Sequence, residues 1–348
     1  MVFTGVEMKI INNKLVSICI PSYNRPKELY RLLESIDSQQ IDKIEIIICE
    51  DKSLHREEIT KVVHHFMSES TYEVKYFENN SNLGYDKNLK ELISKANGNF
   101  VVFMGDDDTF IPQVLDKLIS FLEDHTNIGY VLKSHQYIFK DGRIEKFRYF
   151  DSNQLFSKGE ETYVQLFRKS VFLSGFIINR HYIQDLLIDD FDGTLLFQLY
   201  LLAEVSLQYD CAYFDVPLTQ AKEEGLPFFG NSESEKALYT PGVITIENSI
   251  NFLKGFVQIT SFIDTKYHLK STPKIKRDMS KYFYHNLSIQ RDKGLKEFFR
   301  YISELNKLGF NITIYYYIYL ISLTLFGKKI CDSIIVFLKR ILGKTPKL

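Results

Sequence analysis

The sequence predicts an α/β fold built on a mostly parallel sheet and followed by a helical C-terminal region. Three observations favour it: short apolar runs alternate with helical patterns up to Met104, polar residues follow each run, and strand signals become few after residue 243. The chain has 348 residues, of which 45% are hydrophobic, so it can bury a large core.

Short apolar runs predict buried strands at Leu15–Ile20, Ile44–Cys49 and Phe100–Met104, and a further strand is expected at Tyr72–Phe77. Patterns with helical spacing separate these runs, at Lys27–Ser38, Arg56–Met67 and Asp86–Ala96. Pro26 suits the first position of the first helix. Strands and helices that alternate in this way form a parallel sheet with helices on both faces.

The pattern changes after Gly129, where two strand-like segments surround the turn at Asp141 and Gly142 and predict an antiparallel addition to the sheet. The elements expected next are a helix at Glu160–Lys169, a strand at Ser174–Arg180, a short helix, a helix from about Gly193 to Ser206, and a strand at Cys211–Gln220 closed by Pro217. Residues 222–242 gather Gly, Pro, Ser and charges. We therefore expect an α/β domain over residues 1–242 and a helical region over residues 243–348.

Composition excludes several classes of protein. A net charge of -1 argues against a protein that mainly holds nucleic acid. The four cysteines form no C-x-x-C pair and the N-terminus lacks a signal-peptide core, so we expect a reduced, cytoplasmic setting. The eight histidines are dispersed without an H-x-x-x-H pair, which makes a zinc hydrolase a poor interpretation.

The C-terminal segment has a different character. Residues 310–326 carry no charge but are at the short limit for a membrane span. From Gly327 onward, six basic residues and one acidic residue accompany an amphipathic pattern. We expect residues 310–348 to lie on an anionic membrane surface, with two core helices that expose a basic face as the alternative.

The strongest chemical signal is the turn after the fourth strand, where Asp106, Asp107 and Asp108 follow one another. Three carboxylates at the end of a buried strand repel each other unless a cation lies among them. Mg²⁺ or Mn²⁺ suits carboxylate oxygens and completes its shell with water and substrate phosphates. An acidic surface turn is the alternative. A phosphatase of the D-x-D-x-T type is disfavoured, because Phe110 stands where it needs threonine.

Polar loops follow the other strands at the same sheet edge, where ligands bind in folds of this class. Glu50 and Asp51 can accept hydrogen bonds from nucleotide hydroxyl or amino groups, although Asp51 also suits a helix cap. Gly84 allows close backbone approach, and Lys87 lies in the first turn of the next helix. These loops predict a nucleotide site beside the acidic turn.

The motifs PSYNRP, CEDKS, NLGYDKNL and GDDD together resemble the family 2 glycosyltransferases, which have the GT-A fold. The resemblance covers residues 14–115 well and extends more loosely to about residue 220. The motifs GYDKNL and GDDDTF resemble those of the branch that includes abequosyltransferase-like O-antigen enzymes. One departure concerns the family's D-x-D-D pattern, whose first position falls here on Gly105.

The resemblance implies a role for each motif residue. The residues expected to hold the nucleotide-sugar donor are Pro21, Tyr23, Asn24, Glu50, Asp51, Asn82, Gly84, Lys87 and Asp106, the last near the ribose. Asp107 or Asp108 would bind the metal that bridges the diphosphate. The general base of an inverting transfer would be Asp192, or failing that Asp190, at the start of a helix; a helix cap is the alternative there.

The function implied is a metal-dependent inverting glycosyltransferase with Mn²⁺ or Mg²⁺. It would move a sugar from a UDP, CDP, GDP or dTDP donor to a lipid-linked glycan in bacterial surface polysaccharide (O-antigen or capsule) synthesis, at the inner face of the cell membrane. We expect Ser174 on the acceptor side and Phe228 or Phe229 on a lid. A glycan- or nucleotide-binding protein without turnover is the alternative. A nucleotidylyltransferase is disfavoured, because no glycine-rich basic loop follows the first strand.

Overall fold

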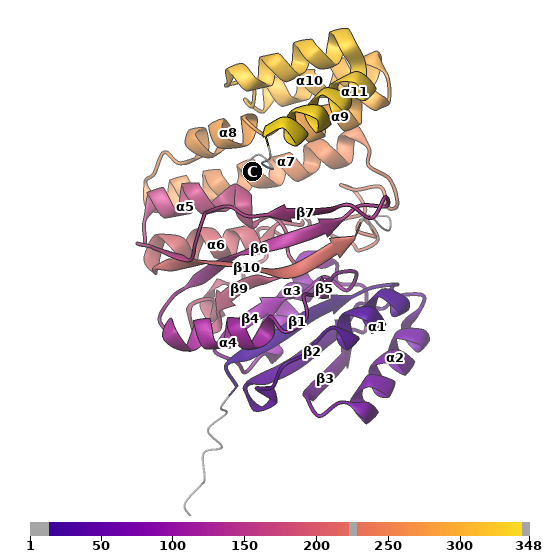
Figure 1. The fold of residues 1–348 in the computed structure, drawn as a ribbon, viewed down its shortest axis with the longest axis vertical. Coiled ribbons are helices and arrows are strands. Elements are labelled where there is room, and N and C mark those ends of the chain that lie inside the picture. Colours follow the sequence, from indigo (N-terminus) through magenta and orange to yellow (C-terminus); the bar gives the residue numbers. More distant parts are fainter. Residues whose placement is uncertain (1–13, 223–227, 343–348) are drawn as a thin grey trace, which may run out of the picture.

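The computed structural model describes residues 14–222 and 228–342, whose strands form one mixed sheet (Figure 1). The strand order is β3-β2-β1-β4-β9-β6-β10-β5, with β7 beside β6 and β8 beside β10. The strands are β1 (Val16–Ser22), β2 (Ile44–Glu50), β3 (Glu73–Glu78), β4 (Phe100–Phe103), β5 (Thr109–Phe110), β6 (Tyr130–Ile138), β7 (Ile144–Phe147), β8 (Gln154–Phe156), β9 (Phe176–Asn179) and β10 (Cys211–Lys222). Two sequence predictions lie at least partly outside the described residues: the absence of a signal-peptide core at the N-terminus, and the basic tail, of which Lys344 and Lys347 are not described.

The N-terminal half of the sheet is parallel, as the alternating pattern predicts. β1 pairs with β2 on one side and β4 on the other, so that Ile18 lies opposite Ile46 and Val102. The connecting helices are α1 (Pro26–Glu34), α2 (Arg56–Glu69) and α3 (Tyr85–Lys95), and α1 begins at the expected proline. The apolar runs of β1, β2 and β4 are buried on both faces, which explains why they do not alternate with polar residues.

The C-terminal half of the sheet is mixed. β6 and β7 form the predicted antiparallel hairpin, and β9 runs antiparallel between β4 and β6. The prediction that Pro217 closes the last strand is wrong, because β10 continues to Lys222. The register of β10 against β6 shifts around Pro217, which is where a strand accommodates a residue without an N–H.

Helices α4 (Leu115–Asp124), α5 (Glu160–Phe167) and α6 (Phe197–Gln208) complete the α/β part. The prediction of a short helix after Arg180 is wrong. Two 3-10 turns, Arg180–Tyr182 and Gln184–Leu186, take its place. The expected start of α6 near Gly193 is also wrong. Gly193 and Leu195 have φ angles of 83° and 62°, which a right-handed helix excludes.

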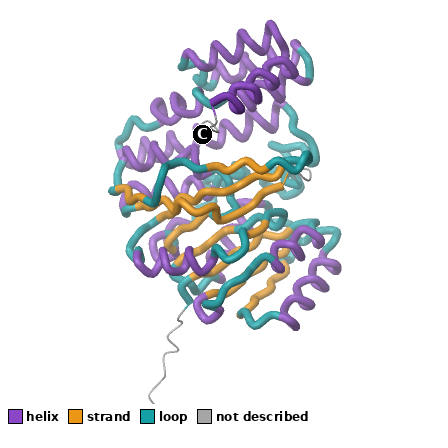
Figure 2. Tube along the Cα trace, in the orientation of Figure 1, coloured by secondary structure: helices purple, strands orange, loops and turns teal. Residues whose placement is uncertain are grey.

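The C-terminal helices pack beyond α5 and α6, at one end of the molecule (Figures 1 and 2). They are α7 (Ile246–Tyr267), α8 (Thr272–Ser280), α9 (Tyr284–Asp292), α10 (Leu295–Lys307) and α11 (Ile314–Leu342). Their apolar residues join one face of the sheet in a single hydrophobic cluster. Gly327, with φ 71°, divides α11 into two helical segments. Within residues 14–222 and 228–342, no helix combines the length and apolar character that crossing a membrane requires.

Candidate functional site

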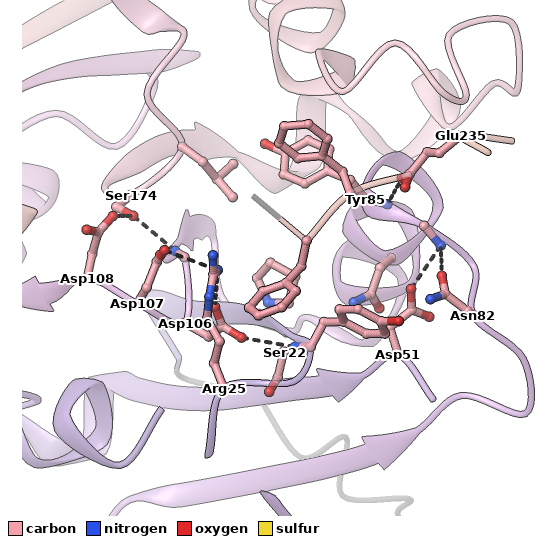
Figure 3. A pocket seen from close by; sticks show the side chains of 18 of the residues that line it. Ser22, Arg25, Asp51, Asn82, Tyr85, Asp106, Asp107, Asp108, Ser174 and Glu235 are labelled. Atoms are coloured by element: carbon pink, nitrogen blue, oxygen red, sulfur yellow. Dashed lines mark hydrogen bonds and ion pairs between the residues drawn. The ribbon is translucent and has the colours of Figure 1, made fainter. Parts of the chain in front are cut away.

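A pocket of about 420 Å³ opens at the carboxyl ends of β1, β2 and β4, where the sequence places the polar loops (Figure 3). Of the residues predicted for the site, its lining includes Pro21, Tyr23, Asp51, Asn82, Gly84, Asp106, Asp107 and Asp108. Among the described residues, the lining does not include Asn24, Glu50, Lys87, Asp190 or Asp192. The volume is that of a typical small-molecule site.

Asp51 organises one end of the pocket. Its Oδ1 accepts hydrogen bonds from Leu83 N (2.8 Å) and Asn79 Nδ2 (2.9 Å), and its Oδ2 accepts one from Gly84 N (2.9 Å). The loop before α3 is therefore wrapped around the carboxylate. Burial raises the pKa of Asp51, and the three donated hydrogen bonds oppose that rise. The alternative of a helix cap is wrong, since α2 begins after His55 without a side-chain cap.

Two residues predicted for the site, Glu50 and Asn24, lie next to this end of the pocket but are not part of its lining. Glu50 is buried and accepts hydrogen bonds from Ser53 N (2.6 Å), Lys52 N (3.1 Å) and the Arg56 side chain. Asn24 Oδ1 accepts a hydrogen bond of 2.9 Å from Leu54 N. Both side chains therefore bind the turn that follows β2.

The acidic turn forms the other end of the pocket (Figure 3). Asp106 accepts hydrogen bonds from Tyr23 N (2.9 Å) and Arg25 Nη1 (3.0 Å), and Asp107 Oδ2 lies 3.1 Å from the same Arg25 nitrogen. Asp108 accepts a hydrogen bond from Ser174 Oγ. Burial and, beyond it, repulsion from Asp107 raise the pKa of Asp106 and of Asp108 to about 7.

Asp107 and Asp108 are carboxylates of the kind that Mg²⁺ or Mn²⁺ uses. A Cβ placed on Gly105 would lie 3.1 Å from Asp107 Oδ1, 3.1 Å from Ser174 Oγ and 3.7 Å from Asp108 Oδ2, so oxygen atoms crowd this position. Among the described residues, no three His, Cys, Asp or Glu side chains form a closed metal cage. One or two carboxylates, completed by water and phosphate, are the usual ligands of Mg²⁺ in such sites.

The two candidates for the general base lie apart from the lining. The Asp192 side chain is 9% exposed and its Oδ1 is 2.7 Å from Lys90 Nζ, while Oδ2 is 3.7 Å from Lys87 Nζ. Asp190 is exposed, and its carbonyl oxygen accepts a hydrogen bond of 2.9 Å from Gln258 Nε2. Lysines of α3 thus surround Asp192 with positive charge.

The structure adds pocket residues that the sequence analysis did not select. Glu235 is buried, and its carboxylate accepts hydrogen bonds from Tyr85 N (2.7 Å) and Gly230 N (2.8 Å). Gly84, with φ 84°, leaves room for this contact, because a Cβ there would lie 2.6 Å from Glu235 Oε1. Glu235 is 150 residues from Tyr85 in the chain, so no local pattern indicates the pairing.

Aromatic side chains line the remaining sides of the pocket. Phe228 and Phe229, the predicted lid residues, both line it, and the Phe228 ring meets Tyr23 edge to face at 6.3 Å between centroids. Phe172 also lines it, and the ammonium of Lys133, which is buried and is not part of the lining, lies 4.3 Å from the centre of the Phe172 ring. Burial lowers the pKa of Lys133 to about 7. A lone lysine within a strand pattern carries no signal that could have selected it.

Comparison with known proteins relates part of this chain to a protein family. Residues 17–185 match the model of glycosyl transferase family 2. The abequosyltransferase RfbV of Salmonella typhimurium is 31% identical over 114 residues, which cover 33% of this chain and 34% of that protein. The GalNAc(5)-diNAcBac-PP-undecaprenol beta-1,3-glucosyltransferase of Campylobacter jejuni is 31% identical over 133 residues, 38% of this chain and 41% of that protein. The matches therefore span about a third to two fifths of these relatives.

A solved structure extends the likeness beyond the matched sequence. S. aureus TarS 1–349, crystallised with UDP-GlcNAc, superimposes with a TM-score of 0.59 at 16% identity, over 84% of this chain and 80% of that one. The chain therefore has the GT-A fold, and its residues 17–185 resemble glycosyl transferase family 2.

Proposed function

We propose that this protein is a metal-dependent inverting glycosyltransferase that moves a sugar from a nucleotide donor to a carbohydrate acceptor. One observation carries the proposal: a single pocket at the sheet edge joins Asp51 and Asn82 at one end to Asp107 and Asp108 at the other (Figure 3). A nucleoside diphosphate has the same two-part chemistry, a hydrogen-bonding nucleoside and an anionic diphosphate.

The nucleoside lies at the end lined by Tyr23, Asp51 and Asn82. The Tyr23 ring offers an apolar face to the base, and the Asp51 carboxylate accepts hydrogen bonds from base or ribose. Asp106 accepts a hydrogen bond from the Tyr23 backbone and lies near the ribose. TarS, which shares the fold, was crystallised with UDP-GlcNAc and with UDP, which supports a nucleotide-sugar donor here.

Asp107 and Asp108 would hold a divalent cation, Mn²⁺ or Mg²⁺, which would supply positive charge to the diphosphate leaving group. Ser174 orients Asp108 by donating a hydrogen bond to its carboxylate. Asp107 is the more accessible of the two, with a side chain that is 35% exposed, so it faces incoming phosphate most directly.

Asp192 is the proposed general base, with Asp190 as the alternative. An inverting transfer needs a carboxylate that removes the proton of the acceptor hydroxyl as that oxygen attacks the anomeric carbon. The Lys90 ammonium lies 2.7 Å from Asp192 Oδ1 and holds this carboxylate in place. Because Asp192 is outside the lining of the pocket, the proposal requires that the acceptor or a movement of residues 189–196 bring the two together.

The acceptor proposed is a lipid-linked glycan of bacterial surface polysaccharide assembly, reached at the inner face of the cell membrane. The Campylobacter jejuni relative is named for an undecaprenol-linked acceptor, which supports this class. α11 provides a surface for membrane contact, because many of its apolar side chains are exposed. They include Ile314, Tyr315, Ile318, Ile321, Leu325, Phe326, Ile330 and Phe337.

A thermal-shift panel tests the donor site. The protein is melted with UDP, GDP, CDP and dTDP, each with and without Mn²⁺, because a ligand that binds only the folded state raises the melting temperature. We expect one nucleotide to raise it, and to do so more strongly with Mn²⁺. Absence of any shift would contradict the donor site. A shift without sugar transfer to any acceptor would favour a binding protein on the same scaffold.

A further inference from the structure

Arg25 touches both the acidic turn and the aromatic cover of the pocket. Its Nη1 lies 3.0 Å from Asp106 Oδ1 and 3.1 Å from Asp107 Oδ2 (Figure 3). Its Cζ lies 4.9 Å from the centre of the Phe228 ring, in cation–π geometry. The same Phe228 ring contacts Tyr23 at the nucleoside end. One side chain therefore connects the cation end of the pocket to its nucleoside end.

The two oxygens of Asp107 face different partners. Oδ2 lies 3.1 Å from Arg25 Nη1, whereas Oδ1 lies on the side of Gly105, toward Ser174 Oγ and Asp108 Oδ2. A divalent cation held by Asp107 and Asp108 would therefore share the Asp107 carboxylate with the guanidinium. Two positive groups on one carboxylate repel each other. In this structure, the Arg25 guanidinium supplies the positive charge beside Asp107.

We propose that Arg25 is a positioning residue that neutralises Asp107 until a divalent cation binds, and that its departure from Asp107 repacks Phe228 over Tyr23. The proposal rests on the cation site at Asp107 and Asp108 given under the proposed function. Arg25 keeps a partner when it moves, because Asp106 is buried and already binds the same nitrogen. Cation binding at one end of the pocket thereby changes the aromatic cover of the other.

The first test measures Mn²⁺ binding by electron paramagnetic resonance, with no nucleotide present. Wild type is compared with Arg25→Gln and with the matched control Lys27→Gln, an exposed basic residue two positions along the chain. Loss of the competing guanidinium predicts that R25Q binds Mn²⁺ about fivefold or more tightly than wild type, and that K27Q binds as wild type does. Equal or weaker binding by R25Q overturns the proposal. If none of the three proteins binds Mn²⁺, the proposed metal site itself is wrong. This outcome differs from failure of the Arg25 proposal, in which the proteins bind Mn²⁺ but R25Q does not bind it more tightly.

The second test uses the fact that the chain contains no tryptophan, so Phe228→Trp creates the sole one. The tryptophan fluorescence of F228W is followed while Mg²⁺ alone is added. We predict that its emission maximum shifts, because the indole loses its contact with the Arg25 guanidinium. The double variant R25Q/F228W is predicted to show no shift, and K27Q/F228W to shift as F228W does. An unchanged emission of F228W at Mg²⁺ concentrations that fill the site would overturn the link to the aromatic cover. This test also holds if R25Q fails to fold, since F228W alone reports the response.

Discussion

Asp86 Oδ1 accepts a hydrogen bond of 3.0 Å from Phe197 N, so a carboxylate of α3 caps the first residue of α6. Its Oδ2 accepts a second hydrogen bond, of 2.9 Å, from Leu195 N. One turn further along α3, Lys90 binds Asp189 and Asp192. α3 also supplies Tyr85 to the pocket. The helix that borders the donor site therefore also fixes the segment that carries the proposed base.

Asp86 makes stability depend on pH. Burial raises the pKa of Asp86 from 3.8 to about 7, against the two backbone hydrogen bonds. The folded state thus keeps a proton that the unfolded state loses near pH 4, so this contribution to stability falls as pH rises from about 4 to 7 and is absent above that. Between pH 6 and 8 the free energy of unfolding should fall by about 1 kcal/mol. We expect Asp86→Asn to remove this part of the pH dependence.

Chemical denaturation at pH 6 and pH 8 checks this prediction in wild type, Asp86→Asn and the exposed control Asp185→Asn. Other buried acids, among them Asp106 and Asp108, titrate in the same range, so the quantity that decides is the difference between variants. A pH dependence that is the same in Asp86→Asn and in wild type would show that burial does not perturb this carboxyl.

The proposed base gives a kinetic prediction. Asp192→Asn removes the proton acceptor but keeps the size of the side chain, so kcat should fall about 10²–10⁴-fold while nucleotide affinity stays unchanged. Asp190→Asn, in the same turn but exposed, should stay within a few-fold of wild type. Release of nucleoside diphosphate during transfer measures kcat, and calorimetry measures affinity. Full activity of Asp192→Asn with a large loss in Asp190→Asn would reverse the two roles.

Glu235 connects the segment from Phe228 to Tyr239 to the start of α3. In Glu235→Gln the side chain keeps one acceptor oxygen, so one of the two buried donors, Tyr85 N or Gly230 N, loses its partner at a cost of about 1–3 kcal/mol. We expect a lower melting temperature and weaker nucleotide binding, by about tenfold. Glu233→Gln is the matched control, because that side chain is 87% exposed in the same segment. Equal nucleotide affinity in both variants would restrict Glu235 to a structural role.

The exposed face of α11 gives a prediction about membranes. Leu325 and Phe326 are 70% and 53% exposed, so the double substitution to serine should leave the fold intact. If this face enters a lipid surface, losing two large apolar side chains should weaken binding to anionic vesicles at least about tenfold. Co-sedimentation with vesicles measures this binding. Leu54→Ser is the control, because Leu54 is 93% exposed and lies near β2, away from α11. Equal sedimentation of the double variant and wild type would contradict the prediction, and dimers of wild type in solution would assign the face to a second copy.

The sequence predicts local features of this protein well and long-range ones poorly. The strands and helices around Ile18, Ile46 and Val102 are predicted because a buried parallel strand has a local signature. Asp51, Gly84 and the acidic turn are predicted because the ends of parallel strands converge on one edge.

The pairings that complete the site have no such signature. Arg25 stands in the motif PSYNRP, yet its partner Asp106 is 81 residues away. Glu235 reaches Tyr85 across 150 residues, and Asp86 caps α6 across 111. The sequence prediction misplaces the start of α6 because contacts distant in the chain determine it. The left-handed backbone at Gly193 and Leu195, together with the distant cap, decides where the helix begins.

The central claim, a donor site that depends on a metal at the acidic turn, is tested most directly with Asp107→Asn. Isothermal titration of the preferred nucleoside diphosphate into wild type and this variant, each with and without Mn²⁺, measures the coupling between the two ligands. We predict that Mn²⁺ tightens nucleotide binding to wild type at least about tenfold, that it leaves the weak binding to Asp107→Asn unchanged, and that both proteins melt at similar temperatures. The same Mn²⁺-dependent affinity in Asp107→Asn and in wild type would contradict the account.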